Sequence, residues 1–581
     1  MSVEVSKSSV YSLHAPQAQV AISKYSVHTL LSEQPSISVS KYSVHTLLAE
    51  PVKVSASKFT VYTLLKSRPP PPYLEEKDLM SVSTAVDASA VARVVGIKTK
   101  FEGLRNGNIF TLPQRIALIG QGATSSIYAT TKRQVTSAHE IATLYGHGSP
   151  LHLAAMQLFP VNGDGIGTIP LTVYPLNDAG SGVASTGDIV PAGAQTVAAE
   201  YRVSVNEILS EPFVISVGDT LATIVTNMAA AINAVLHMPV IAVADTTVTS
   251  ESCDLTSKWK GVSANDIKVK VLGSTSAGTT FAVTNPAGGL VNPNIDDALS
   301  QVGDVWETLV LNCLDIADTV TLDKYSTFGE GRWGALTRKP LVVFTGNTAT
   351  TVNNATTVSD ARKSDRTNAQ LVAPGSSNLP FVVAARQLVR IAKLANNSPA
   401  HDYGRQIADG LTPGDDGDQW TYIDRDVAIK KGSSSITVRD GEVYIGDVVT
   451  FYHPDGNPLP EYRFVVDIIK LQNVIFNIDL IFNTVEWDGR PLIKDSDPTT
   501  NKDAKKPMMA KSDVGVMLDN LGLAAIIMDV KESKQGVVAQ INSQNPKRLD
   551  LFIPVKLSGN TNIISIDLGF GFFFGQAEVV A

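Results

Sequence analysis

The sequence predicts a multidomain protein of the α+β or α/β class, with mixed sheets and helices. Residues 114–122 (QRIALIGQG) have the pattern of a buried strand that ends in glycines, and residues 137–160 follow with a helical pattern. A helix pattern followed by a strand pattern returns at residues 293–315, and another buried strand pattern lies at residues 339–346. Alternating strands and helices are typical of a sheet covered by helices, so we assign the two regions to one core.

The composition argues for folded domains and against a nucleic-acid coat. The 581 residues suggest three or four folded units at about 150 residues each. Hydrophobic residues make up 44% of the chain, which is enough to build cores. The formal net charge of −8 argues against direct nucleic-acid binding, because neutralising phosphates requires a basic surface.

Cysteine usage and hydropathy indicate a protein made in a reducing compartment. Cys253 and Cys313 are far apart, so the sequence offers no disulfide framework and no cysteine zinc site. Residues 1–10 lack the basic start and apolar stretch of a signal peptide. Apolar runs such as residues 521–528 are shorter than the ~20 residues that span a bilayer. We therefore expect a soluble protein without membrane insertion.

Residues 1–68 contain four copies of a 17-residue repeat. The copies begin at Ser6, Ser23, Ser40 and Ser57, and the second and third both read SKYSVHTLL. Alternating side chains predict one strand in each copy, and a proline after each copy ends that strand. The predicted strand positions are Tyr25, Val27, Tyr42, Val44, Phe59 and Val61.

Two interpretations of the repeats remain open. They are either strands that pair with a partner while tethered to the body, or a duplicated linker that has no partner. His28 and His45 occupy equivalent positions, but Tyr11 and Tyr62 fill the same position in the other copies. The position therefore favours a planar ring over a metal ligand.

The composition along the chain predicts seven segments. A shift to Gly, Ser, Ala and Thr at residues 177–198, a helix pattern at 221–235 and several short strand patterns indicate an inserted β-rich domain. A final block carries apparent paired strands at 548–557 and 562–574. The predicted segments are 1–68 (repeats), 69–90 (proline-rich linker), 91–110 (a strand before the core), 111–178 (first part of the core), 179–289 (inserted domain), 290–460 (second part of the core) and 461–581 (C-terminal domain).

Motifs for catalysis or cofactor binding are incomplete. Gly120 and Gly122 follow a strand, but the third glycine of a dinucleotide-binding turn is missing. Asp415, Asp416 and Asp418 cluster among glycines without the twelfth-position glutamate of an EF-hand, which favours a solvated acidic turn. The chain has no G-x-S-x-G and no H-E-x-x-H motif. The sequence predicts a structural protein rather than an enzyme, with no cofactor and no metal site.

Several segments resemble the contractile-tail sheath proteins of Mu-like phages. The resemblance runs from residue 91 to the C-terminus in the family's order and does not include the repeats. The segments that carry it are LTSKWKGVSANDIKVKV (255–271) after the helix pattern GDTLATIVTNMAAAINA (218–234), GRWG (331–334), the helix pattern opening at Pro380, WTYIDRDVAIKKGSSSITV (420–438) and VVTFY (448–452).

The resemblance implies a sheath-type core with strand-donating N- and C-terminal arms. In such sheaths, subunits stack as hexameric rings around a tail tube, and each arm lends a strand to a neighbouring subunit. The implied partners are further copies of the chain, the tail tube, the baseplate and the tail terminator. The implied location is the virion tail after assembly in the host bacterial cytoplasm. The predicted exchange positions are Val94, Val95, Ile97, Phe101, Leu551, Ile553, Val555, Ile563, Ile564, Ile566, Leu568, Phe570 and Phe572.

Three alternatives stay open from the sequence. The sheath could belong to a phage-derived particle, such as a tail-like bacteriocin or a secretion device. The chain could instead be a virion surface adhesin that binds through its repeats. The third alternative, an α/β enzyme with a binding appendage, would need a catalytic cluster that the sequence does not supply.

Overall fold

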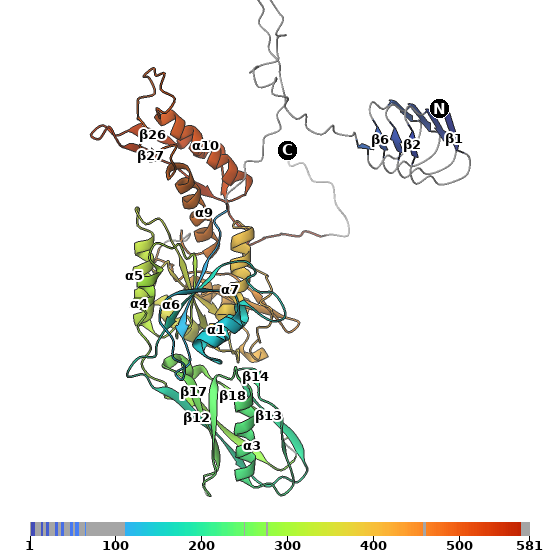
Figure 1. Ribbon diagram of the computed structural model, residues 1–581, viewed down its shortest axis with the longest axis vertical. Helices are drawn as coiled ribbons and strands as arrows, with labels where there is room; N and C mark the ends of the chain where they lie inside the picture. Colours follow the sequence, from blue (N-terminus) through green and yellow to red (C-terminus); the bar gives the residue numbers. More distant parts are fainter. Residues whose placement is uncertain are drawn as a thin grey trace, which may run out of the picture. The chain divides into compact units, whose positions relative to one another are not determined.

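The computed structural model describes residues 111–570, except 249, 275–276 and 457–460, together with eight short strands between residues 2 and 65. The chain divides into two compact units, Met1–Arg105 and Asn106–Ala581 (Figure 1). The predicted positions Tyr25, Val27, Tyr42, Val44, Phe59, Val61, Val94, Val95, Ile97, Phe101 and Phe572 lie outside the described residues.

The repeats of the first unit form two parallel four-stranded sheets (Figure 1). Paired strands are offset by one repeat, since Ser2 pairs with Gln19, Gln19 with Ser36 and Ser36 with Lys53. One sheet contains β1 (Ser2–Val5), β3 (Gln19–Ile22), β5 (Ser36–Val39) and β7 (Lys53–Ala56), and the other contains β2 (Leu13–Ala15), β4 (Leu30–Ser32), β6 (Leu47–Ala49) and β8 (Leu64–Leu65).

Each repeat is therefore one turn of a parallel β-solenoid. Each turn contributes two short strands, one to each sheet, where one strand in each copy was predicted, and the predicted strand positions themselves lie outside the described residues. A single strand cannot bury its faces alone, whereas stacked turns complete one another's hydrogen bonds.

A mixed six-stranded sheet forms the core of the second unit. Its strand order is β10-β11-β9-β20-β21-β22, and only the edge strand β10 is antiparallel to its neighbour. All residues of the five parallel strands are buried, which explains the apolar runs that begin β9, β20 and β21. The bounds are β9 Ile116–Gln121, β10 Arg133–Val135, β11 Leu171–Leu176, β20 Leu309–Asn312, β21 Val342–Asn347 and β22 Asn368–Val372.

Helices cover both faces of this sheet. Ile116 and Leu118 share a hydrophobic cluster with α1, α2 and α7, whereas Ala117 and Ile119 share another with α4 and α5. The alternation along β9 places these clusters on opposite faces. The bounds are α1 Ala138–Tyr145, α2 Pro150–Leu158, α4 Asp296–Val302, α5 Thr319–Arg332, α6 Val352–Asp360, α7 Pro380–Asn397 and α8 Tyr422–Lys430.

The helix predicted over residues 137–160 is two helices. Gly146 and Gly148 have positive φ angles of 92° and 76°, which interrupt the helical backbone. The side chain of Ser149 then caps α2 by accepting a hydrogen bond from the His152 amide. Pro150 occupies the first turn of the new helix, where a missing N–H costs little.

Between β11 and β20 the chain forms two antiparallel four-stranded sheets and α3 (Leu221–Ala234). Trp259 of this region is fully buried and packs edge-on against Phe381 of α7, with 6.2 Å between the ring centroids. The strands are β12 Ala184–Ala192, β13 Ala199–Val205, β14 Ile208–Leu209, β15 Phe213–Ile215, β16 Val240–Asp245, β17 Ser252–Lys260, β18 Val269–Gly273 and β19 Thr280–Ala287, with the short 3-10 helix η2 at Val262–Asp266.

The remaining elements follow α8. None of the helices in the described part of the chain has the length and apolarity needed to cross a membrane. The bounds are β23 Ile436–Arg439, β24 Glu442–Ile445, α9 Val465–Phe482, α10 Pro507–Leu523, β25 Ile527–Met528, α11 Val530–Gly536, β26 Val538–Ile541, β27 Leu549–Phe552 and β28 Lys556–Leu557.

The predicted pairing of residues 548–557 with 562–574 is wrong over the described residues. β27 pairs with β26, β28 pairs with β25, and residues 561–570 form no strand. A hairpin needs only a short loop between β26 and β27, so the local partner is favoured over the terminal segment.

Candidate assembly surfaces

A hydrophobic cluster beneath α9 and α10 supports the C-terminal strands. Val474 of α9 and Val514, Leu518 and Leu521 of α10 are buried in it together with Ile526. β26 lies against α10, and β27 is its hairpin partner (Figure 1). α10 also contacts β25, and α9 contacts β28, so these two helices support both small sheets.

The β26–β27 hairpin is an incomplete sheet. Val538 pairs with Phe552 and Ile541 pairs with Leu549, but neither strand pairs with any other strand in the described residues. Val538 and Phe552 are 52% and 64% exposed. Two-stranded sheets are marginally stable in water, and an open edge presents unpaired N–H and C=O groups.

Residues 561–570 continue the chain beyond β28 as an exposed apolar extension. Every residue in this range is exposed and none belongs to a helix or a strand. Exposures range from 72% to 87% for Ile563, Ile564, Ile566, Leu568 and Phe570. An exposed segment this apolar has the composition expected of a site that pairs with another chain.

The structure separates the predicted C-terminal exchange positions into two groups. Leu551, Ile553 and Val555 are partly buried against the hydrophobic cluster of their own chain. Ile563, Ile564, Ile566, Leu568 and Phe570 lie together in the exposed extension. β26 was not predicted, although the polar run NSQNPKR at 542–548 before β27 is a turn signal between two short strand patterns.

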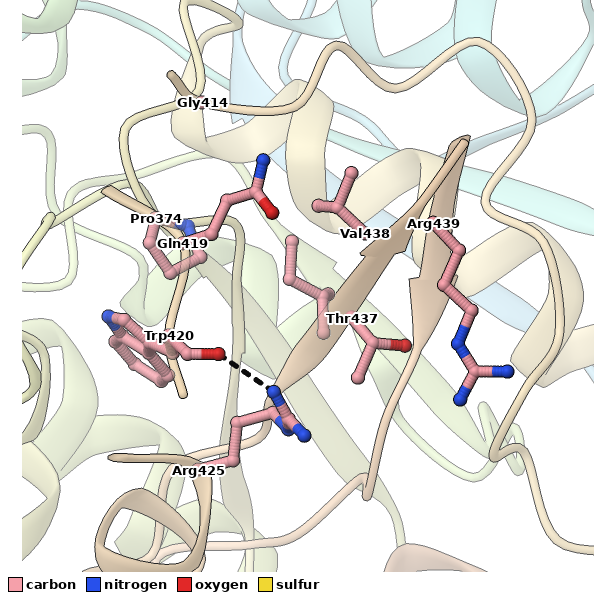
Figure 2. A pocket seen from close by; sticks show the side chains of 9 residues that line it. Pro374, Gly414, Gln419, Trp420, Arg425, Thr437, Val438 and Arg439 are labelled. Atoms are coloured by element: carbon pink, nitrogen blue, oxygen red, sulfur yellow. Dashed lines mark hydrogen bonds between the residues drawn. The ribbon is translucent and has the colours of Figure 1, made fainter. Parts of the chain in front are cut away.

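A small pocket beside β23 does not offer a catalytic set. It encloses about 180 Å³ and is lined by polar and cationic side chains that include Gln419, Arg425, Thr437 and Arg439 (Figure 2). Arg425 Nη1 donates a hydrogen bond to the carbonyl oxygen of Trp420 at 2.7 Å. None of the residues that line the pocket is an acid, a histidine or a cysteine, so no general base or nucleophile faces it. Across the described residues, no group of three or more His, Cys, Asp or Glu side chains could hold a metal ion.

A hydrogen-bonded pair of carboxyl groups with raised pKa values lies where the β-rich region meets the core. Asp266 ends η2 and shares a hydrogen bond with Asp315, which follows β20 of the core. Burial and the neighbouring charge of Asp315 raise the pKa of Asp266 to about 7, against a smaller opposing effect of Lys268. Burial also raises the pKa of Asp315. This pair joins the region between β11 and β20 to the core, and neither side chain lines the pocket beside β23.

Comparison with known proteins agrees with the resemblance seen in the sequence. The chain is 24% identical over 439 residues to the tail sheath protein of the Mu-like prophage FluMu from Haemophilus influenzae. The alignment covers 74% of this chain and 87% of that relative. The chain is similar to phage tail sheath proteins. No family model matches it.

Two solved sheath tail proteins overlap the structure in part. The protein from Listeria innocua is 11% identical, with a TM-score of 0.42, and the match covers 78% of this chain and 94% of that one. The protein from Desulfitobacterium hafniense is 13% identical, with a TM-score of 0.39, and the match covers 77% of this chain and 93% of that one. Because both TM-scores are below 0.5, the similarity to sheath proteins rests on the sequence relative.

Proposed function

We propose that this chain is the structural subunit of a contractile tail sheath. It polymerises helically around a tail tube and contracts to drive that tube through the host cell envelope during genome delivery. The observation that carries the proposal is that the β26–β27 hairpin near the C-terminus has open strand edges and that an exposed apolar extension follows it in the chain. The similarity to a prophage tail sheath protein supports it.

Strand exchange between copies would complete this unit. The extension containing Ile563 to Phe570 adds to an open edge of β26–β27 in a neighbouring copy, and its apolar side chains cover the exposed Val538 and Phe552. Each added backbone hydrogen bond contributes a net of about 0.5–1.5 kcal/mol, so even a short donated strand binds firmly. A head-to-tail contact of this kind produces a helix when its rotation does not close into a ring.

The N-terminal side of the core supplies the second arm in this scheme. Val94, Val95, Ile97 and Phe101 form an apolar strand pattern directly before the core. One arm on each side of the subunit links it to two neighbours, which gives stacked rings of six that stay connected while the compact regions move. The tube, the baseplate and the tail terminator are the further partners, and the assembled sheath is part of the virion.

Contraction requires two packings of the same subunit and no chemical fuel. The extended lattice is kinetically trapped during assembly, and the contracted lattice is the more stable one. The arms keep neighbouring copies joined while the surfaces of the compact regions exchange contacts. Free energy stored in the lattice then performs the work, so the chain acts as a structural protein rather than an enzyme.

Negative-stain electron microscopy of the purified full-length chain tests this function. We expect hollow striated tubes with six-fold symmetry that lengthen as protein concentration rises. A variant that lacks residues 563–581 should form no tubes, because it has lost the strand that its C-terminal arm donates and the N-terminal arm alone does not connect the lattice. Normal tubes from this truncated variant would contradict strand exchange, and a full-length chain that never polymerises, even with a tube template, would contradict the sheath proposal.

A further inference from the structure

Lys470 is a fully buried cation at the base of the C-terminal extension. It lies on α9 and is 0% exposed. Its Nζ donates to the carbonyl oxygen of Ser558 at 2.6 Å, to Asn560 Oδ1 at 2.7 Å and to Asp467 Oδ1 at 3.1 Å. Each of its three donor hydrogens therefore has an acceptor.

Two of these three acceptors belong to the segment that immediately precedes the exposed extension. A buried ammonium group is tolerated only when it is paired and hydrogen-bonded, so Lys470 depends on Ser558 and Asn560 for its place in the core. Ser558 and Asn560 in turn depend on Lys470 for their position. Hydrogen bonds from a charged donor are roughly twice as strong as neutral ones, and they hold a segment that has little other structure.

The remaining contacts show where the fixed part of the chain ends. The Ser558 amide donates to the Ile526 carbonyl at 3.1 Å, and Asn560 Nδ2 donates to the Ala400 carbonyl at 2.8 Å. Asn562 Nδ2 still donates to Asp447 Oδ1 of the body at 3.5 Å, but from residue 561 to residue 570 every side chain is exposed. The strand that enters this segment, β28, has only two residues and two paired positions.

We propose that Lys470 is the positioning residue that fixes where the C-terminal extension leaves the body, so that a second copy of this chain receives it in one defined place. The inference rests on the proposed function, because it assumes that the extension is donated to a neighbour. Tension on the donated strand then passes through Ser558 and Asn560 to α9. Without the lysine, only the two-residue β28 ladder and the neutral hydrogen bonds of Ser558 and Asn560 to the Ile526 and Ala400 carbonyl oxygens would bear that tension.

This assignment divides the C-terminus into residues that belong to the body and residues that are donated. A chain shortened by residues 563–581 keeps both acceptors of Lys470 and should melt at the wild-type temperature. A chain shortened by residues 558–581 leaves the buried ammonium group with Asp467 only. We expect its melting temperature to fall by about 5 °C or more.

The decisive experiment compares Lys470→Met with Lys556→Met in the full-length chain. Lys556 is an exposed lysine on β28 that pairs with Asp529, so it controls for the loss of one charge near the same segment. Hydrogen exchange of the peptide 556–562 and the protein concentration at which tubes appear are measured. For Lys470→Met, we expect at least tenfold faster exchange and at least a tenfold higher concentration for tube formation, with Lys556→Met close to wild type.

Substitutions of Asn560 keep the test decisive if Lys470→Met does not fold. Asn560→Leu removes the acceptor from the extension's base and should reproduce the faster exchange. Asn560→Asp keeps an acceptor for the ammonium group and loses the same donor to the Ala400 carbonyl as Asn560→Leu does, so its exchange should stay closer to wild type than that of Asn560→Leu. Wild-type exchange and wild-type tubes in both Lys470→Met and Asn560→Leu would overturn the inference. Failure of the wild-type chain itself to form tubes would count against the proposed function, while the exchange comparison would still decide the role of Lys470.

Discussion

The core sheet and the C-terminal sheets of this chain differ in how completely they are paired. In the core, five parallel strands are buried along their whole length, and helices cover both faces. In the C-terminal unit, β25–β28 and β26–β27 are two-stranded, and large apolar side chains such as Phe552 remain exposed. These two regions thus contrast one fully paired and covered sheet with two that have only two strands each.

The two regions meet different requirements. The core must fold within one chain, so its apolar side chains are satisfied internally. Apolar surface and strand edges left open in the C-terminal sheets lower the solubility of a free monomer, and the strand exchange proposed above would remove that cost by covering them with another copy. Identical substitutions in the two regions should therefore have opposite consequences for folding and for assembly.

The largest expected effect comes from a matched pair, Phe344→Ala and Phe552→Ala. Phe344 in β21 is 0% exposed, and its truncation should lower the free energy of unfolding by about 3–5 kcal/mol through loss of burial and a new cavity. Phe552 is 64% exposed, so its truncation should change the free energy of unfolding by less than about 0.5 kcal/mol. Urea unfolding of both variants, each in a chain that lacks residues 563–581 to prevent polymerisation, measures the difference.

Assembly should reverse the order of these two variants. In the full-length chain, folded Phe552→Ala should need a higher protein concentration to form tubes, because it loses apolar surface that a donated strand would cover. Folded Phe344→Ala molecules should polymerise normally. Equal losses of stability in the two variants would contradict the distinction between a finished and an unfinished sheet.

Local patterns predicted the finished sheet better than the unfinished ones. β9, β11, β20, β21, α3 and α7 follow from continuous apolar runs or helical spacing within their own residues. The pairing of β27 with β26 instead of residues 562–574 depends on which segments meet in space, which periodicity does not encode. The split between α1 and α2 is indicated by the run GHGSP at 146–150, where two glycines end one helix and a serine N-cap followed by proline begins the next.

The candidate site divides in the same way. The apolar positions from Ile563 to Phe570 were predicted because a terminal run of large apolar residues is visible in one dimension. Lys470 was not predicted, since a single lysine in VVDIIKLQN is typical of any amphipathic helix. Its partners Ser558 and Asn560 are about ninety residues away in the chain, and only the fold brings them together.

An intermediate effect is expected at the joint between the core and the β-rich region, where Asp266 meets Asp315. The folded-state pKa of Asp266 is about 7, above its ordinary value of 3.8, so its contribution to stability is fully present below pH ~4 and is lost as pH rises through 7. Asp266→Asn removes the ionisation and retains an amide that can donate to Asp315. The variant should gain about 1–3 kcal/mol over wild type at pH 8 and little at pH 4.

Thermal unfolding at pH 4, 6 and 8 checks this sign. The exposed Asp297 of α4 gives a matched control, because Asp297→Asn removes the same charge without a buried partner. Lys268, Asp315 and Asp318 act on the same pair and remain in both variants. A gain for Asp266→Asn that is equal at pH 4 and pH 8 would contradict the assigned ionisation.

The smallest effect is expected from the N-terminal repeats, whose two sheets are finished by repetition within the chain. Deleting residues 1–68 should leave the melting temperature of the body and the formation of tubes unchanged, since the repeats belong to a separate compact unit. Loss of tubes in this variant would show that the solenoid takes part in the lattice.

The solenoid register can be tested apart from assembly by two internal deletions. Removing residues 23–39 takes out one whole turn and brings Ser40 to the position of Ser23, so the remaining strands can pair with the same 17-residue offset. Removing residues 23–31 takes out only half a turn and shifts every later strand out of register. Hydrogen exchange across residues 2–65 should stay protected in the first variant and become fast in the second, because a stack of repeats tolerates the loss of a whole unit but not of a fraction of one. Equal protection in the two variants would mean that the strands are not held by the repeat offset.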